Sequence, residues 1–168
     1  MNLNPDLLFC LQNLAREWIY LSSEIKSINK HMHFLHPNEE EIYNAYIKIT
    51  GIGATIGKIL LHELGDTMQF SNEEKLFAFC GLTPSEYSSG EHERRGHITR
   101  QGNPIIRKVL VQAAWVAVRK DQFFKEYFIK LSKRKGACRA IVAVARKLIG
   151  RARCAIKKKD NYEAIKAE

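Results

Sequence analysis

The sequence predicts an all-α protein, in which one long N-terminal helix precedes a domain of shorter helices. Apolar residues recur every three or four positions over most of the chain, which is the period of an amphipathic helix. No segment shows the apolar–polar alternation of paired strands, and no internal repeat interrupts the pattern. We therefore expect helices joined by turns, with one long loop rich in serine, glycine and basic residues.

The first 35 residues carry the most regular pattern. Their apolar positions alternate spacings of four and three, which is the seam of a coiled coil. A seam of this length on one helix needs a partner helix to cover it. We expect residues 1–45 to form a coiled-coil helix and turn that pairs with a second copy; packing onto its own domain is the alternative. The seam comprises Leu7, Leu11, Leu14, Trp18, Leu21, Ile25 and Ile28.

Residues 46–168 form the second predicted domain, and its first feature is a Gly-x-Gly turn. Gly51 and Gly53 lie between apolar residues, which predicts a helix, a tight turn and a second helix. Glycines let the backbone approach a ligand, and the free amides opening the second helix attract anions. With Lys58 close by, the segment resembles a helix-hairpin-helix element that grips a DNA phosphate. A purely structural helical turn is the alternative.

A short helix and a long loop follow. Ser71 is expected to cap the helix, with Glu74 completing a capping box. Residues 81–103 are dense in Gly, Ser and charged residues and predict a loop of about twenty residues. Loops of that length are usually functional or disordered, and hydrophobic helices on both sides favour function.

Three helices complete the chain. Asn103 caps the first and Pro104 begins it, and it runs to about Arg119 with Trp115 among its buried residues. The others cover residues 122–133, with Phe123 in the core, and residues 137–157.

Positive charge is concentrated in the second half of the chain. Residues 91–159 hold twenty Lys/Arg against four Asp/Glu, a net charge of +16 in a chain whose total is +9. Ordinary surfaces mix both signs, so a block of one sign indicates a polyanionic partner, here nucleic acid. Arg139, Arg146 and Arg153 recur every seven residues, beside Lys147, and predict a basic ridge on the last helix.

Composition excludes several other classes of protein. The four cysteines form no C-x-x-C pair and follow no secretory leader, which indicates reduced thiols in the cytosol. No apolar stretch approaches the roughly 20 residues that a spanning helix needs. A chain of 168 residues can bury a core without a metal or a disulfide, and no metal site is expected.

An ordered series of short motifs runs from about residue 45 to residue 155. In this order the motifs are Gly51-Ile52-Gly53, Gly81-Leu82-Thr83-Pro84, Tyr87-Ser88-Ser89-Gly90, Arg94-Arg95-Gly96, Ile98-Thr99, Gly102-Asn103, Arg107 and Leu110-Val111-Gln112-Ala113-Ala114. The series resembles the C-terminal domain of DEDD-type insertion-sequence transposases, relatives of the Piv invertase that form the insertion-sequence family numbered one-hundred-ten. The heptad helix resembles the coiled coil between the two domains of these enzymes.

The resemblance implies a role for each matched position. The pattern Pro-x-x-x-x-Ser-Gly makes Ser89 the candidate nucleophile that attacks a DNA phosphodiester, with Ser88 as its competitor and a plain turn serine as the alternative. Three loop arginines fit this chemistry, because positive charge stabilises an alkoxide and a developing phosphorane. The candidate nucleic-acid contacts are Gly51, Gly53, Lys58, Arg94, Arg95, Arg100, Arg107, Arg139, Arg146, Lys147 and Arg153.

The resemblance also implies a partner domain. Complete members carry an acidic, metal-binding N-terminal domain, and this chain starts at the coiled coil, so Mg²⁺ is expected only with that domain. We expect a transposase fragment that binds DNA, and an element-encoded guide RNA as a second ligand, with a serine that is inactive alone. A non-catalytic nucleic-acid-binding remnant and a coiled-coil interaction protein are the alternatives.

Overall fold

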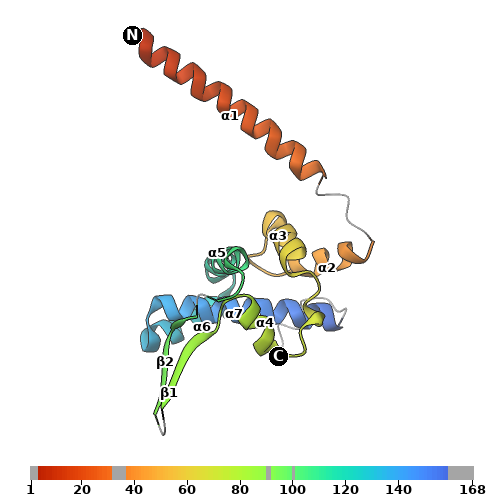
Figure 1. Ribbon diagram of the computed structural model, residues 1–168, viewed down its shortest axis with the longest axis vertical. Helices are drawn as coiled ribbons and strands as arrows, with labels where there is room; N and C mark the ends of the chain where they lie inside the picture. The colour runs from red at the N-terminus through yellow and green to blue at the C-terminus, as the bar shows by residue number, and fades with distance from the viewer. Residues whose placement is uncertain (1–3, 32–36, 90–91, 100, 159–168) are drawn as a thin grey trace. The chain divides into compact units, whose positions relative to one another are not determined.

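The computed structural model describes residues 4–31, 37–89, 92–99 and 101–158, and the side chains of residues 4–31, 39–85, 98–99 and 101–157. The chain divides into two compact units, Met1–His36 and Pro37–Glu168 (Figure 1). The helix that follows residue 36 therefore belongs to the second unit, whereas the sequence pattern grouped it with the first.

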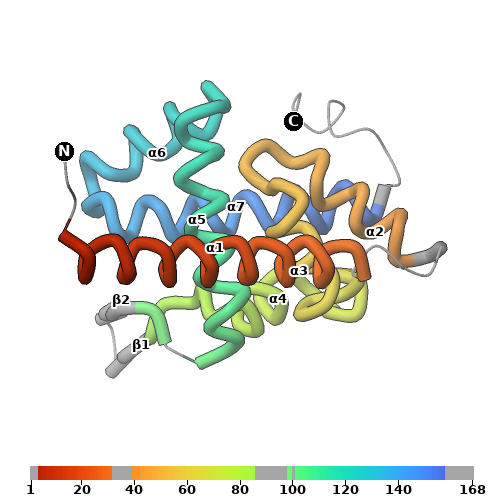
Figure 2. The backbone as a smooth tube through the Cα atoms, turned by 90° about the horizontal axis from the view of Figure 1, so that it is seen from above, coloured from red at the N-terminus to blue at the C-terminus, as the bar shows by residue number. Residues whose placement is uncertain are grey.

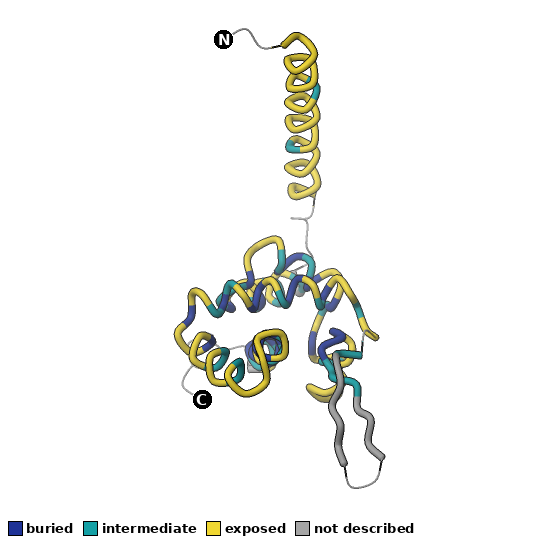
Figure 3. The backbone as a smooth tube through the Cα atoms, turned by 90° about the vertical axis from the view of Figure 1, so that its left-hand side faces the viewer, coloured by how far each residue is buried: buried dark blue, intermediate teal, exposed yellow. Residues whose placement is uncertain are grey.

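The first unit consists of one long helix, α1 (Pro5–His31). Asp6 lies in its first turn and Lys30 in its last, which suits the positive and negative ends of the helix dipole. None of its residues is buried, and Figure 3 draws it as exposed almost throughout. All seven seam residues are exposed, from 47% for Leu11 to 75% for Trp18. The predicted helix is present, whereas its predicted pairing with a second copy stays a prediction.

The second unit is built almost entirely from helices, and the predicted all-α class is confirmed. The helix α5 packs on α6 and α7, α6 packs on α7, and α3 packs on both α2 and α5. Figure 2 shows α5 crossing α7. The elements are α2 (Pro37–Ile47), α3 (Ala54–Leu64), a 3-10 turn η1 (Thr67–Gln69), α4 (Glu73–Phe79), β1 (Pro84–Ser89), β2 (His92–Ile98), α5 (Pro104–Lys120), α6 (Gln122–Lys135) and α7 (Ala137–Lys158).

One apolar core joins these helices. It gathers inward-facing side chains such as Leu60 of α3, Leu110 of α5 and Leu148 of α7, all fully buried. Tyr46 and Cys80 are ionisable groups within this core. Burial raises the pKa of Tyr46, whose hydroxyl donates to the Gly65 carbonyl oxygen at 2.8 Å, and raises the pKa of the Cys80 thiol to about 12. Both groups are therefore neutral and structural at physiological pH.

Helix caps fix where two helices begin. Oδ1 of Asn103 accepts from the backbone N–H groups of Ile105 (2.9 Å) and Ile106 (3.3 Å), which confirms the predicted cap of α5. The expected cap of α4 at Ser71 is wrong by one residue. Asn72 takes that position, because its side chain accepts from the backbone N–H of Lys75 at 2.9 Å.

The predicted long loop contains an antiparallel β-hairpin. Strand β1 pairs with β2 from Pro84 opposite Ile98 to Ser89 opposite His92, with an irregularity in register after Pro84. The expectation that no strands pair was therefore wrong for this segment. These strands are mostly polar, so they lack the apolar alternation that marks a half-buried strand in a sequence.

Two aromatic side chains expected in the core are partly exposed. Trp115 is 42% exposed and meets Phe128 edge to face, with ring centroids 5.3 Å apart. Phe123 is 41% exposed at the start of α6. Helical spacing shows that a residue lies on the apolar side of a helix, but not how far neighbouring helices reach over it. Among the described residues, no helix is both long enough and apolar enough to span a membrane.

Candidate nucleic-acid interface

The base of the hairpin is fixed to the end of α4 by close backbone contacts. Gly81, just after α4, has φ +66°, and Gly102, just before α5, has φ +91°. A Cβ on Gly102 would lie 2.6 Å from the Ala78 carbonyl oxygen and 2.7 Å from that of Phe79. The backbone N–H of Asn103 donates to the Phe79 carbonyl at 2.8 Å. Only glycine fits at position 102, because any side chain would push the hairpin base away from α4.

Arg107 lies beneath the same base, in the first turn of α5. Its Nη1 atom is 2.5 Å from the position that a Cβ on Gly81 would take. That atom is buried and has no hydrogen-bond partner among the described residues. The predicted nucleic-acid contact at Arg107 is thus half-buried under the hairpin, and glycine at position 81 leaves the space that its guanidinium fills.

The two candidate nucleophiles lie at the end of β1. Ser89 is paired with His92 and Ser88 with Glu93, so both stand at the tip side of the hairpin. Figure 1 shows this hairpin projecting from the helices of the second unit. The side chains of both serines lie outside the described residues, and the nucleophile remains a prediction.

The loop arginines are placed only by backbone register. Arg94 pairs with Tyr87 and Arg95 with Glu86, which puts both on β2 across from the serine strand. Their side chains, and the whole of Arg100, lie outside the described residues. The strand register places these arginines near the serine along the backbone, and the predicted gathering of their positive charge around it stays a prediction.

The Gly-x-Gly turn lies between α2 and α3, and its two glycines differ. Gly51 has φ +99°, and a Cβ there would clash with the Ala113 carbonyl oxygen and lie 3.0 Å from the Ala117 nitrogen. Packing on α5 therefore explains this glycine. Gly53 caps α3 without any side-chain hydrogen bond and is exposed, and a Cβ added to it would meet no atom within 4 Å. Of the two, only Gly53 leaves open space for a ligand.

Lys58 does not sit on the surface of this turn. Its side chain is 5% exposed, within α3. A phosphate contact needs the ammonium group at an accessible surface, which this conformation does not provide.

The predicted basic ridge of α7 is wrong for two of its three arginines. Nε of Arg146 donates to the Leu82 carbonyl oxygen at 2.8 Å, and its guanidinium lies over the Phe77 ring. Arg153 donates from Nη2 to the Phe70 carbonyl oxygen at 2.7 Å and from Nη1 to the Thr67 carbonyl oxygen. Irregular segments leave carbonyls without helical partners, and these side chains satisfy them. Both arginines therefore fasten α7 to the segment before the hairpin.

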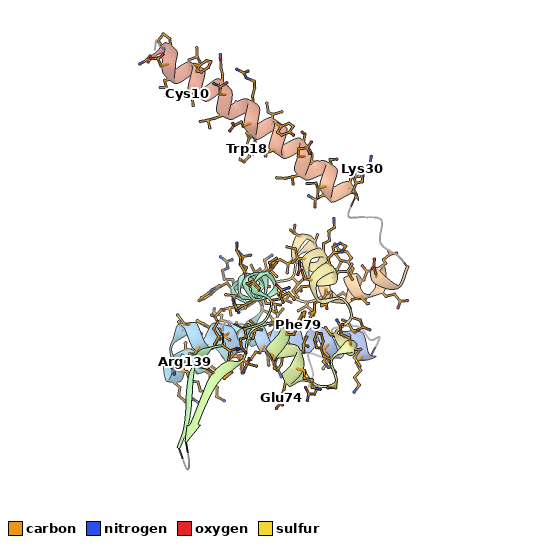
Figure 4. All side chains as sticks on the ribbon, viewed as in Figure 1. Cys10, Trp18, Lys30, Glu74, Phe79 and Arg139 are labelled. Atoms are coloured by element: carbon orange, nitrogen blue, oxygen red, sulfur yellow. The ribbon has the colours of Figure 1, made fainter. Side chains whose placement is uncertain are left out.

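Other basic residues of the helical layer do face solvent. Arg139, labelled in Figure 4, and Lys147 are exposed on α7, as predicted for that surface. Both line a groove between α6, α7 and the hairpin base. Phe123 and Tyr127 line it too. Sequence reasoning placed Phe123 in the core and did not predict a groove beside it. The available signal was the i, i+4 spacing of these two aromatic residues on a helix that ends in three basic residues.

The described residues provide no metal site. No three His, Cys, Asp or Glu side chains among them come close enough to hold an ion. No chemical step is therefore derived through Mg²⁺ from the described residues.

Sequence comparison places this architecture among transposases. Residues 45–128 match the family described as Transposase IS116/IS110/IS902 family. Over 121 residues the chain is 28% identical to the transposase for insertion sequence element IS1328 of Yersinia enterocolitica, covering 72% of this chain. It is 29% identical over 152 residues, 86% of this chain, to the putative transposase y4pF/y4sB of Sinorhizobium fredii. It is 34% identical over 103 residues, 59% of this chain, to the transposase for IS1111A of Coxiella burnetii.

The matches cover only part of each relative. They span 36% of the Yersinia protein, 38% of the Sinorhizobium protein and 28% of the Coxiella protein. The matched region contains the Gly-x-Gly turn, the hairpin with its anchoring glycines, and α5.

Proposed function

This chain belongs to the IS116/IS110/IS902 transposase family, and we propose that its second unit binds DNA during transposition. The net charge of +16 over residues 91–159 carries this proposal. Several arginines of that block are used inside the fold, among them Arg146, Arg151 and Arg153. Exposed cations nevertheless remain on all three of its helices, among them Lys108, Lys125 and Arg139. Cations on a folded surface attract the phosphate backbone and release its counterions, whatever the base sequence.

The start of α3 is the proposed phosphate contact of the Gly-x-Gly turn. Its cap residue, Gly53, is exposed and offers no side chain to the first amides of the helix. Such amides, together with the helix dipole, favour an anion. The helix-hairpin-helix interpretation thus rests on the Gly53 end of the turn, since Gly51 and Lys58 are both used in packing.

We expect duplex DNA to bind with strong salt dependence, and Gly53→Asp to weaken it about tenfold at low salt. An aspartate suits an extended helix cap such as this one (φ −88°, ψ 177°), so the fold should be kept while the carboxylate repels phosphate. Fluorescence anisotropy between about 50 and 200 mM salt gives both the affinity and the slope, near −0.9 per phosphate contact.

The matched control is Asn72→Asp, which adds the same negative charge at the exposed cap of α4. It should leave the affinity within about twofold. An affinity for DNA that does not change with salt rejects nucleic-acid binding. Equal losses of affinity in Gly53→Asp and Asn72→Asp reject the phosphate contact at α3.

Ser89 is the proposed nucleophile on the hairpin. In the reaction that the family resemblance implies, its Oγ forms a bond to a DNA phosphorus and the bond from phosphorus to one sugar oxygen breaks. The serine gives up its proton and the departing sugar oxygen gains one, so the strand is held as a phosphoserine ester. The strand register puts Ser89 at the end of β1, on a hairpin that projects from the helices of the second unit (Figure 1).

A suicide DNA substrate that cannot be religated tests this role. We expect a denaturation-resistant adduct at the mass of this chain when a full-length family transposase, separable by mass, is present to supply an acidic domain. Ser89→Ala should abolish the adduct and Ser88→Ala should keep it. Absence of any adduct at this mass, or its survival in Ser89→Ala, contradicts the assignment.

The proposed role of α1 is self-association through its apolar seam. All seven seam residues are 47% or more exposed on the described helix, and Figure 4 shows its side chains, Trp18 among them, projecting along its length. A helix of 27 residues with an uncovered seam gains stability when a second seam packs against it.

We expect sedimentation equilibrium to find a dimer of the 168-residue chain, and Leu14→Glu to weaken it at least about tenfold, because the change buries a charge in the seam. Gln12→Glu adds the same charge at an exposed position off the seam and should leave the dimer intact. A monomeric parent chain, or equal weakening in both variants, contradicts pairing through the seam.

Three remaining parts of the proposal concern partners and place. An element-encoded guide RNA is a second candidate ligand of the same basic surface. Mg²⁺ belongs to the proposal only through an acidic domain, since the described residues gather no ligand set. The cytosol and nucleoid are the proposed location, because a transposase has to reach chromosomal DNA.

A further inference from the structure

A groove with a cavity volume of 1060 Å³ runs beside the base of the serine hairpin. Its lining includes Pro84 and Ile98, which pair with each other at the base of the hairpin. The other lining residues come mainly from α6 and α7, with Glu73 and Phe77 from α4. The volume is slightly above the roughly 300–1,000 Å³ of ordinary small-molecule pockets, which suits a short stretch of an extended polymer.

Two aromatic rings form part of the groove lining. Phe123 and Tyr127 lie one helical turn apart on α6, with ring planes 7° apart and centroids separated by 6.3 Å. The Arg151 guanidinium lies 4.1 Å from the centroid of the Phe123 ring. Because Arg151 is only 6% exposed, it supports that ring from within the protein, while Phe123 itself keeps 41% of its surface exposed.

The charged residues of the lining are mainly positive. Lys135, Arg139 and Lys147 are exposed around the groove, and Glu73 is the single acidic side chain among the described residues that line it. Flat apolar rings flanked by cations match a ligand with flat apolar faces and an anionic backbone. A duplex keeps its base faces stacked inside, so only an unpaired strand can offer them.

We propose that this groove binds an unpaired DNA strand next to the serine hairpin. One or two bases stack on the Phe123 and Tyr127 rings, and the adjoining phosphates contact Arg139 and Lys147. The inference deepens the proposed DNA-binding function and rests on it. It gives the hairpin a means of holding a strand that has separated from its complement.

The aromatic contact is tested by Phe123→Leu in the 168-residue chain. We expect the affinity for a thymidine oligonucleotide of about 12 nucleotides to fall about tenfold, because stacking on one ring is lost. The affinity for duplex DNA should stay within about twofold, since the duplex offers no base face. Trp115→Leu is the matched control, a 42% exposed aromatic residue on α5 outside the groove, and should leave both affinities unchanged.

The charged contact is tested independently by Lys147→Gln. The control is Lys75→Gln, at an exposed position on α4 that lies outside the groove and outside the basic block of residues 91–159. Lys147→Gln should lower the salt slope for the oligonucleotide by about one phosphate contact, and Lys75→Gln should not. Circular dichroism melting of each variant verifies the fold. Because Lys147 lies on the surface, Lys147→Gln remains informative even if Phe123→Leu unfolds.

The outcomes separate this inference from the proposed function. Suppose that duplex DNA binds with salt dependence but that neither Phe123→Leu nor Lys147→Gln changes oligonucleotide binding. That result overturns the groove as the strand-binding site and leaves the proposed function standing. If the chain binds neither duplex DNA nor the oligonucleotide, the proposed function itself is overturned. If a uridine oligonucleotide binds more tightly than the thymidine oligonucleotide and loses as much affinity in Phe123→Leu, the ligand of the groove is RNA and the assignment to DNA is overturned.

Discussion

The second unit depends on the close backbone contact between Gly102 and the end of α4. It joins three things at one point: the end of the hairpin, the beginning of α5 and the last turn of α4. Asn103, the next residue, caps α5 and also donates from Nδ2 to Glu63 of α3 at 2.7 Å. A two-stranded hairpin is at best marginally stable alone, so the contact at its base attaches it to the helices. The end of β1, where Ser89 lies, is therefore joined to the helical core through this base.

The basic residues of the second unit divide into structural and surface groups. Arg146 and Arg153 satisfy carbonyls before the hairpin and brace the segment from η1 to β1 against α7. Arg139 and Lys147 remain exposed beside the groove. Net charge alone therefore overstates the number of phosphates that this unit can contact, because an arginine bonded inside the fold is not free to meet a ligand.

Local signals in the sequence predicted the helices, but they did not predict which distant segments pack against them. Asn103 and Pro104 predict the start of α5, because the cap and the first helical position depend only on residues in the same turn. The hairpin escaped prediction because its strands lack apolar alternation and are held by contacts with α4, far from their own residues. Spacing placed Arg139, Arg146 and Arg153 on one face of α7, but the carbonyls that capture two of them come from distant segments. For the same reason Gly51 suggested a ligand, where the structure shows helix packing.

Hydrogen exchange in Gly102→Ala measures the anchor most directly, with Gly136→Ala as the comparison. Both glycines have positive φ, +91° and +81°, but only Gly102 lacks room for a Cβ. Gly136 has φ +81° and ψ 156°, a region that glycine adopts almost alone, so we predict that Gly136→Ala costs about 3 kcal/mol of backbone strain. Gly102→Ala should cost more than this, because its Cβ also meets backbone atoms, and should accelerate exchange of the Thr99 and Asn103 amides, which bond to Thr83 and Phe79. Equal costs in the two variants, with both amides still protected in Gly102→Ala, would contradict the account.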